Sequence, residues 1–138
     1  MTKTGKDIQD DFYRLLKGSS LEQAVSGSVY KNGYRPRDSR LEDITVTFTT
    51  ATARQVQEGV VTINIFVPDI DPYSNGVWVE DGSRTMALER AALEWFDGVS
   101  REQAPMRLRL QETVYTMADA DIGQHFIVMR VRFNYLDN

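Results

Sequence analysis

The segment at residues 58–69, Glu-Gly-Val-Val-Thr-Ile-Asn-Ile-Phe-Val-Pro-Asp, constrains the fold of this chain more than any other. Between positions 61 and 67 apolar residues stand at every second position, while Thr62 and Asn64 fall on the other face. Only Val60 and Phe66 interrupt the pattern. Such alternation predicts a strand with one buried face, and we expect it at the centre of a sheet.

An amphipathic helix is predicted over residues 83–96, after a polar loop. Its apolar side chains recur at i, i+4, i+7 and i+8: Leu88, Ala92, Trp95 and Phe96. This spacing gives the helix one apolar stripe that can lie across a sheet. Asp81 or Ser83 is the expected N-cap, and Gly98 is expected to end the helix.

The N-terminal third predicts a helix and a short hairpin. Thr4 is the expected N-cap of a helix that Gly18 ends. Its stripe is again spaced i, i+4, i+7 and i+8: Ile8, Phe12, Leu15 and Leu16. A single helical turn is expected over residues 20–25. Asn32 and Gly33 are a strong hairpin signal, which predicts two short arms at 27–30 and 34–37.

The remaining strands follow from alternation of apolar and polar residues. A threonine-rich strand is predicted at 44–49, paired with the central strand. Another begins at Met106 and continues to Met117, with a change of phase near Thr113 that indicates a bulge. A turn at 118–123 then leads into a long last strand, whose polar face carries Arg130 and Arg132.

These elements predict an α+β fold in a single domain that spans residues 1–138. We expect an antiparallel sheet of about four to six strands with two helices packed on it, because neighbouring strands usually pair and helices cover a sheet face. The expected order is helix, short hairpin, hairpin, helix, hairpin.

Composition excludes several classes of protein. No apolar run approaches the roughly 20 residues that cross a bilayer, and the first residues do not form a signal peptide, so we expect a cytoplasmic protein without a membrane partner. The chain has no cysteine, which removes disulfides, thiolate catalysis and cysteine-based zinc sites. A formal charge of −4 argues against nucleic acid as a partner, because that affinity depends on Lys and Arg.

No catalytic or cofactor motif is evident. His125 is the only histidine, and no serine or cysteine nucleophile motif accompanies it. An enzyme would have to use it with Asp119 or Asp121, and we favour a structural histidine. The acidic residues around the loop at 69–81 lack the calcium-binding pattern, so turn and capping roles are expected for them. We therefore predict no enzyme, metal or cofactor.

Three groups of residues are candidates for an interface. Arg35, Arg37 and Arg40 form a basic loop that suits phosphate, or carboxylates of a neighbouring subunit; the alternative is a solvated loop without a partner. Tyr73 and Trp78 stand in a loop, where aromatic side chains are typical of interfaces. Arg130 and Arg132 raise the same question for the last strand, should it lie at a sheet edge.

The order of elements resembles the tail terminator, or tail completion, proteins of long-tailed bacteriophages and prophages. The matching features are residues 8–16 of the first helix, the segment 21–36 with Gly-Ser-Val-Tyr, the strand at 60–67, the helix at 83–96 and the strand at 126–135. The likeness is one of pattern and length. The Arg-Asp-Ser-Arg segment after Pro36 and the long loop at 69–81 depart from it.

This resemblance implies a non-enzymatic tail morphogenesis protein that forms a homo-oligomeric ring, expected to be hexameric, at the end of the tail tube. Its partners would be its own copies, tail-tube proteins and head-connector proteins, and it would act in the host cytoplasm or in the virion. The alternative from the residues alone is a small cytoplasmic module that binds a ligand or peptide with the loop carrying Tyr73 and Trp78.

Overall fold

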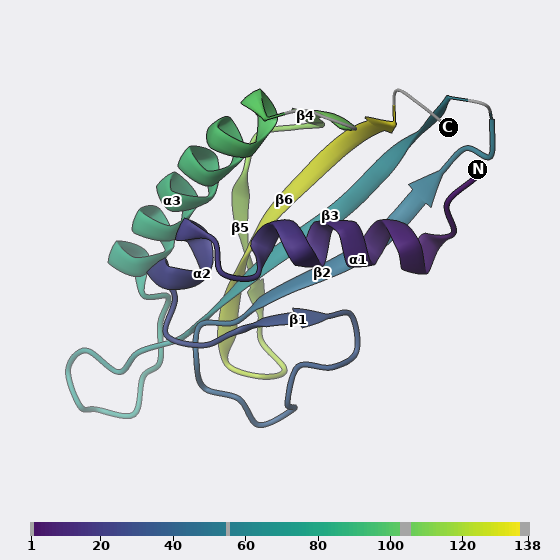
Figure 1. Cartoon of the computed structure of the whole chain (residues 1–138). Helices are drawn as coiled ribbons and strands as arrows, with labels where there is room; N and C mark the ends of the chain where they lie inside the picture. Colours follow the sequence, from purple (N-terminus) through teal and green to yellow (C-terminus); the bar gives the residue numbers. More distant parts are fainter. Residues whose placement is uncertain (1, 55, 103–105, 136–138) are drawn as a thin grey trace.

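A computed structural model describes residues 2–54, 56–102 and 106–135 of the chain. Three helices lie on one face of a six-stranded sheet, so the fold is α+β (Figure 1). The elements in chain order are α1 (Gly5–Leu16), α2 (Ser20–Ala24), β1 (Val29–Lys31), β2 (Ile44–Ala51), β3 (Gln57–Pro68), α3 (Gly82–Arg101), β4 (Met106–Leu110), β5 (Tyr115–Asp119) and β6 (Gln124–Tyr135).

The sheet is ordered β1-β2-β3-β6-β4, and β5 also pairs with β6. The predicted central strand is confirmed, since β3 pairs with β2 on one side and with β6 along its whole length on the other. Strands β4 and β5 lie end to end along the outer side of β6, which places β6 inside the sheet. The break between them, at residues 111–114, confirms the predicted change of phase near Thr113.

The predicted antiparallel sheet is wrong at one edge, because β1 pairs with β2 in parallel. The predicted short hairpin is wrong for the same reason. Gly33, at φ 89°, does form a turn in which the Tyr34 N–H donates to the Lys31 carbonyl at 3.0 Å. The chain after the turn is drawn away by Arg35, which binds Asp43, so no return arm forms at 34–37.

The two predicted helices are confirmed and α2 adds a third. In α1 the Thr4 hydroxyl accepts from the Asp7 N–H, and the Asp7 carboxylate accepts from the Thr4 N–H, which completes a capping box. The expected turn at 20–25 is the five-residue α2, capped by Ser19.

The predicted end of the long helix is wrong. Asp81 caps α3 as expected, but the helix continues through Gly98 to Arg101. A glycine inside a helix costs only about 1 kcal/mol, and Val99 packs against the core beyond it. The core contact therefore outweighs the helix-breaking tendency of Gly98.

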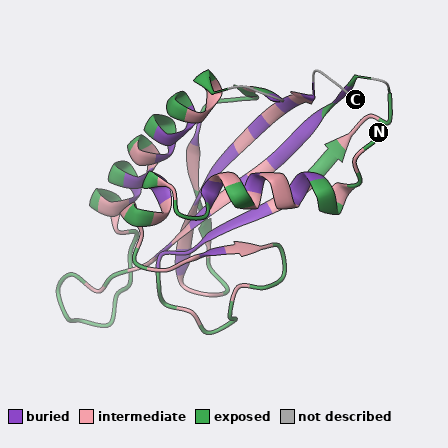
Figure 2. Cartoon of the chain, in the orientation of Figure 1, coloured by how far each residue is buried: buried purple, intermediate pink, exposed green. Residues whose placement is uncertain are grey.

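The core fills the space between the helices and one sheet face, where the alternating residues of β3 and β6 are buried (Figure 2). The helices contribute Ile8, Phe12, Leu16, Leu21, Leu88, Ala92, Trp95 and Phe96. Tyr135 closes one end of this core and donates its hydroxyl to Asp11 at 2.6 Å. Burial, with the Asp11 carboxylate beside it, raises the pKa of the Tyr135 hydroxyl.

No helix among the described residues covers the opposite sheet face, which we call the open face. Residues that lie opposite each other on neighbouring strands share a face, so the register identifies its members. Polar and charged residues of this face are Thr45, Thr47, Glu58, Thr62, Asn64, Arg107, Arg109, Arg130, Arg132 and Asn134. The open face carries one of the candidate surfaces.

Candidate functional site

Residues 69–81, which we call the arm, loop out between the end of β3 and the start of α3 (Figure 1). Tyr73 is 83% exposed and Trp78 is 59% exposed. Ile70, Val77 and Val79 are exposed with them, and most of the arm is coloured as exposed in Figure 2. The structure therefore gathers five large apolar side chains on one projecting segment, outside the core.

Hydrogen bonds within the arm give it a defined shape. The Ile70 N–H donates to the Val79 carbonyl at 2.9 Å and the Val79 N–H donates to the Ile70 carbonyl at 2.8 Å. At the tip, the Asp71 carboxylate accepts from the N–H groups of Asn75 at 3.0 Å and Gly76 at 2.9 Å. The turn role predicted for this acidic residue is confirmed.

His125 ties the two ends of the arm together. Its Nδ1 lies 2.7 Å from Asp69 Oδ1, and its Nε2 lies 3.8 Å from Glu80 Oε1. The hydroxyl of Thr85, on α3, donates to the other oxygen of Glu80 at 2.6 Å. The partners of this histidine are thus the arm carboxylates, rather than the Asp119 or Asp121 that an enzyme was expected to use. Its task in this geometry is to hold the base of the arm.

Three arginines stand close together on the open face, and we call Arg107, Arg109 and Arg132 the arginine strip. Arg109, on β4, lies directly opposite Arg132 on β6. Arg107 lies two residues before Arg109 on the same face, opposite Asn134. No carboxylate among the described residues is within ion-pair distance of these three guanidinium groups. Like charges placed this way repel, so the strip concentrates positive charge at one place on the open face.

A shallow hollow lies along the arginine strip. One part, of about 270 Å³, is lined by all three arginines together with Glu58. A second part, of about 360 Å³, shares Arg132 and Glu58 and adds Gln111. The hollow is open and mixed in polarity, which suits a segment of another protein better than an enclosed small ligand.

Arg130 shares the open face but is already paired. It binds the Glu112 carboxylate, and its Nη1 donates to the Tyr115 hydroxyl at 3.1 Å. The hydrogen bond to Glu112, followed by that to Tyr115, raises the pKa of the Arg130 guanidinium. We therefore place Arg130 at the border of the strip.

The predicted basic loop is divided between two environments. The side chain of Arg35 is 11% exposed, and its Nε donates to the fully buried Asp43 at 2.9 Å. It also donates to Gln124 and stacks 4.1 Å from the Phe66 ring centre. Arg37 is exposed, and the exposed Arg40 donates to the Ile122 carbonyl at 3.0 Å. Arg35 is used inside the subunit, so Arg37 and Arg40 alone remain at the surface.

No protein-family model matches this chain, and no curated protein matches it significantly. Within the described residues, no group of three or more His, Cys, Asp or Glu side chains has the geometry of a metal site. Over the same residues, no helix combines the length and apolar character needed to span a bilayer.

The sequence interpretation missed Arg107 and Arg109 as members of a site. Their alternation with Met106, Leu108 and Leu110 indicated a polar strand face. Nothing in the local pattern showed that this face would lie beside Arg132, because that requires the register of β4 on β6. The arginine strip is a product of strand pairing.

Proposed function

We propose that this chain is a non-enzymatic structural assembly protein that oligomerises into a ring at the end of a phage or prophage tail tube. The single observation that carries the proposal is the arm, on which Ile70, Tyr73, Val77, Trp78 and Val79 are exposed together. Exposing clustered apolar side chains to water is unfavourable, and large exposed apolar patches are typical of protein interfaces.

The open face of the sheet adds a second surface for an assembly contact. Stable contacts between protein copies bury on the order of 800 Å² on each partner. The total exposed area is 8044 Å², so a contact of this size would cover about a tenth of it.

The resemblance in element order supports the tail terminator class, with tail-tube and head-connector proteins as further partners. Such a protein acts in the host cytoplasm, or in the virion once it is incorporated there. The α+β core with helices on one face leaves the other face for neighbours, which agrees with a ring subunit.

The alternative is a small module that binds a ligand or peptide through the arm, and the exposed rings of Tyr73 and Trp78 also favour it. These rings are 83% and 59% exposed, whereas side chains that line a ligand pocket are mostly enclosed by it. The arm therefore suits insertion into another surface better than capture of a small molecule.

Light scattering across a wide concentration range tests the proposal. We expect the mass of wild-type protein to rise toward that of a ring, and the double variant Tyr73→Ala/Trp78→Ala to stay near the monomer mass of 15.8 kDa. Tyr34→Ala is the matched control, since this ring is 72% exposed but lies outside the arm. Wild-type protein that stays monomeric at every concentration would favour the binding module instead.

A further inference from the structure

We infer that the arm of one copy docks on the arginine strip of a second copy. This contact rests on the proposed oligomerisation and specifies which surfaces meet. The occupant of the strip is a segment of this same chain, presented by a neighbour. The charges of the two surfaces, their positions on the molecule and the preorganised shape of the arm each support this pairing.

The charges of the two surfaces are complementary. The arm contains four carboxylates, Asp69, Asp71, Glu80 and Asp81, and no Lys or Arg. Its formal charge of −4 equals that of the entire chain, so the remainder is neutral overall. Against that background the strip is a local concentration of positive charge. Complementary potentials of this kind select the partner and fix its register.

The arm also supplies side chains that suit an arginine surface. Guanidinium groups stack on aromatic faces, and this attraction between Arg and Trp or Tyr is stronger when the pair is shielded from water. Tyr73 and Trp78 are the two aromatic residues of the arm and are both exposed.

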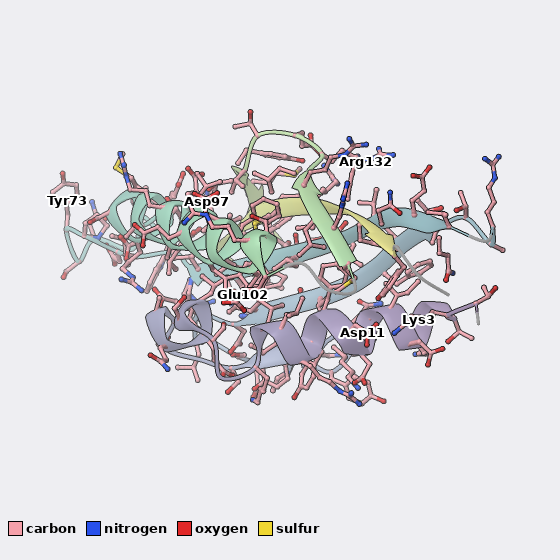
Figure 3. The ribbon with its side chains drawn as sticks, turned by 45° about the horizontal axis from the view of Figure 1, so that its top comes forward. Lys3, Asp11, Tyr73, Asp97, Glu102 and Arg132 are labelled. Atoms are coloured by element: carbon pink, nitrogen blue, oxygen red, sulfur yellow. The ribbon has the colours of Figure 1, made fainter. Side chains whose placement is uncertain are left out.

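The two surfaces lie at different ends of the molecule. Figure 3 shows Tyr73 at one end of the molecule and Arg132 on the side of the sheet opposite α1, well away from Tyr73. An arm therefore reaches the strip of a neighbour and not its own. A contact between two different patches is heterologous, and repeated copies of it generate a closed ring when the rotation allows.

The arm is ordered before it docks. The hydrogen bonds between Ile70 and Val79, the turn around Asp71 and the base formed by His125 hold its shape in the isolated subunit. Preorganisation of this kind lowers the entropy lost on association.

Cross-linking between engineered cysteines tests the contact, and the absence of native cysteine makes the labelling specific. Val77→Cys places a thiol on the arm, and Gln111→Cys places one at the rim of the strip without removing an arginine. The two variants are purified separately, mixed and treated with a short flexible bis-maleimide. We expect a mixed dimer of one Val77→Cys and one Gln111→Cys chain. The chain carrying both substitutions should give a ladder that ends at the ring size.

A charge-reversal pair tests the electrostatic part. Arg109→Glu/Arg132→Glu should abolish the cross-link and raise the concentration needed for half assembly by at least roughly tenfold. Arg90→Glu/Arg101→Glu makes the same charge change at exposed positions of α3. This control should keep the cross-link and the wild-type concentration for half assembly. Circular dichroism establishes that each variant is folded.

The outcomes separate the docking contact from ring assembly itself. If wild-type protein oligomerises by light scattering but yields only Val77→Cys homodimers, or no cross-link, the docking contact is wrong and the assembly function stands. If wild-type protein stays monomeric and no cross-link forms, both are overturned. A mixed cross-link that survives Arg109→Glu/Arg132→Glu would also contradict the contact.

Discussion

Arg109 and Arg132 face each other directly across two antiparallel strands, β4 and β6. Like charges in this position destabilise a sheet by a few tenths of a kcal/mol to about 1 kcal/mol. The isolated subunit gains nothing from that arrangement. A partner that brings carboxylates would relieve the repulsion, which is why we infer that the strip is the docking site of the arm.

Replacing one member of this pair should stabilise the isolated subunit. Arg109→Thr removes the repulsion and introduces a strong strand former, so we expect the free energy of unfolding to rise by about 0.5 kcal/mol at low salt. Urea denaturation followed by tryptophan fluorescence measures it. Arg107→Thr is the matched control, because this residue faces Asn134 and should give a smaller gain. Equal effects of the two substitutions would show that repulsion between Arg109 and Arg132 is negligible.

The buried Arg35–Asp43 pair should be essential to the fold. Asp43 is 0% exposed and accepts from Arg35, Ser39 and the Ser28 N–H. Asp43→Ala leaves a buried guanidinium without its partner, which costs about 3–5 kcal/mol of unfolding free energy. Chemical denaturation measures this loss.

Asp38→Ala controls for that experiment, since it removes a carboxylate from an exposed position of the same loop. It should change the free energy of unfolding by no more than about 0.5 kcal/mol. A similarly small effect of Asp43→Ala would mean that the buried pair contributes little.

Two glycines should respond in opposite directions to alanine. A Cβ on Gly59 would lie 2.0 Å from the Thr50 carbonyl oxygen, where β2 bulges toward β3, so Gly59→Ala should cost about 1–3 kcal/mol. Gly98 lies inside α3 with open space around it, so Gly98→Ala should raise stability by about 0.5–1 kcal/mol. Thermal unfolding of both variants tests the pair, and a loss in Gly98→Ala would contradict the helix through this residue.

The junction between α1 and α2 should make stability depend on pH. The Gly18 N–H donates to Glu22 at 2.7 Å and, with Lys17, holds the pKa of the Glu22 carboxyl below its ordinary value of 4.5. A depressed pKa contributes stability above the ordinary value, and this contribution disappears as the pH falls through the folded-state pKa.

The difference in unfolding free energy between wild type and Glu22→Gln should therefore be largest at neutral pH and shrink in acid. Denaturation series at several pH values measure it. Glu94→Gln, which removes an exposed carboxylate of α3, controls for the loss of one charge. A difference in unfolding free energy that grows on acidification would contradict the predicted direction of the pH dependence.

Patterns of local spacing predicted most of the fold. The alternation in β3 and the stripes of α1 and α3 identified the buried faces, because each depends only on residues a few positions apart. The parallel edge strand was missed, since Asn32 and Gly33 favour a hairpin locally. Arg35 overrides that preference through Asp43, eight residues away, which no local pattern reveals.

The candidate surfaces divide in the same way. Tyr73 and Trp78 were found because aromatic residues in a polar loop are visible in the sequence, and both are exposed on the arm. Arg132 was found as a polar strand residue, whereas its neighbours Arg107 and Arg109 depend on strand pairing over more than twenty positions. A candidate surface that lies on one segment can be found from the sequence. One that is built from several strands can be found only when the strand register is known.

Native mass spectrometry of the concentrated protein tests most directly whether identical copies close into a ring. The account predicts one discrete species with a fixed number of subunits, six if the resemblance to tail terminators holds, which the Tyr73→Ala/Trp78→Ala variant fails to form. A closed ring of another number would retain the assembly function and correct the size. A monomer, or a dimer that grows no further as concentration rises, would contradict the account.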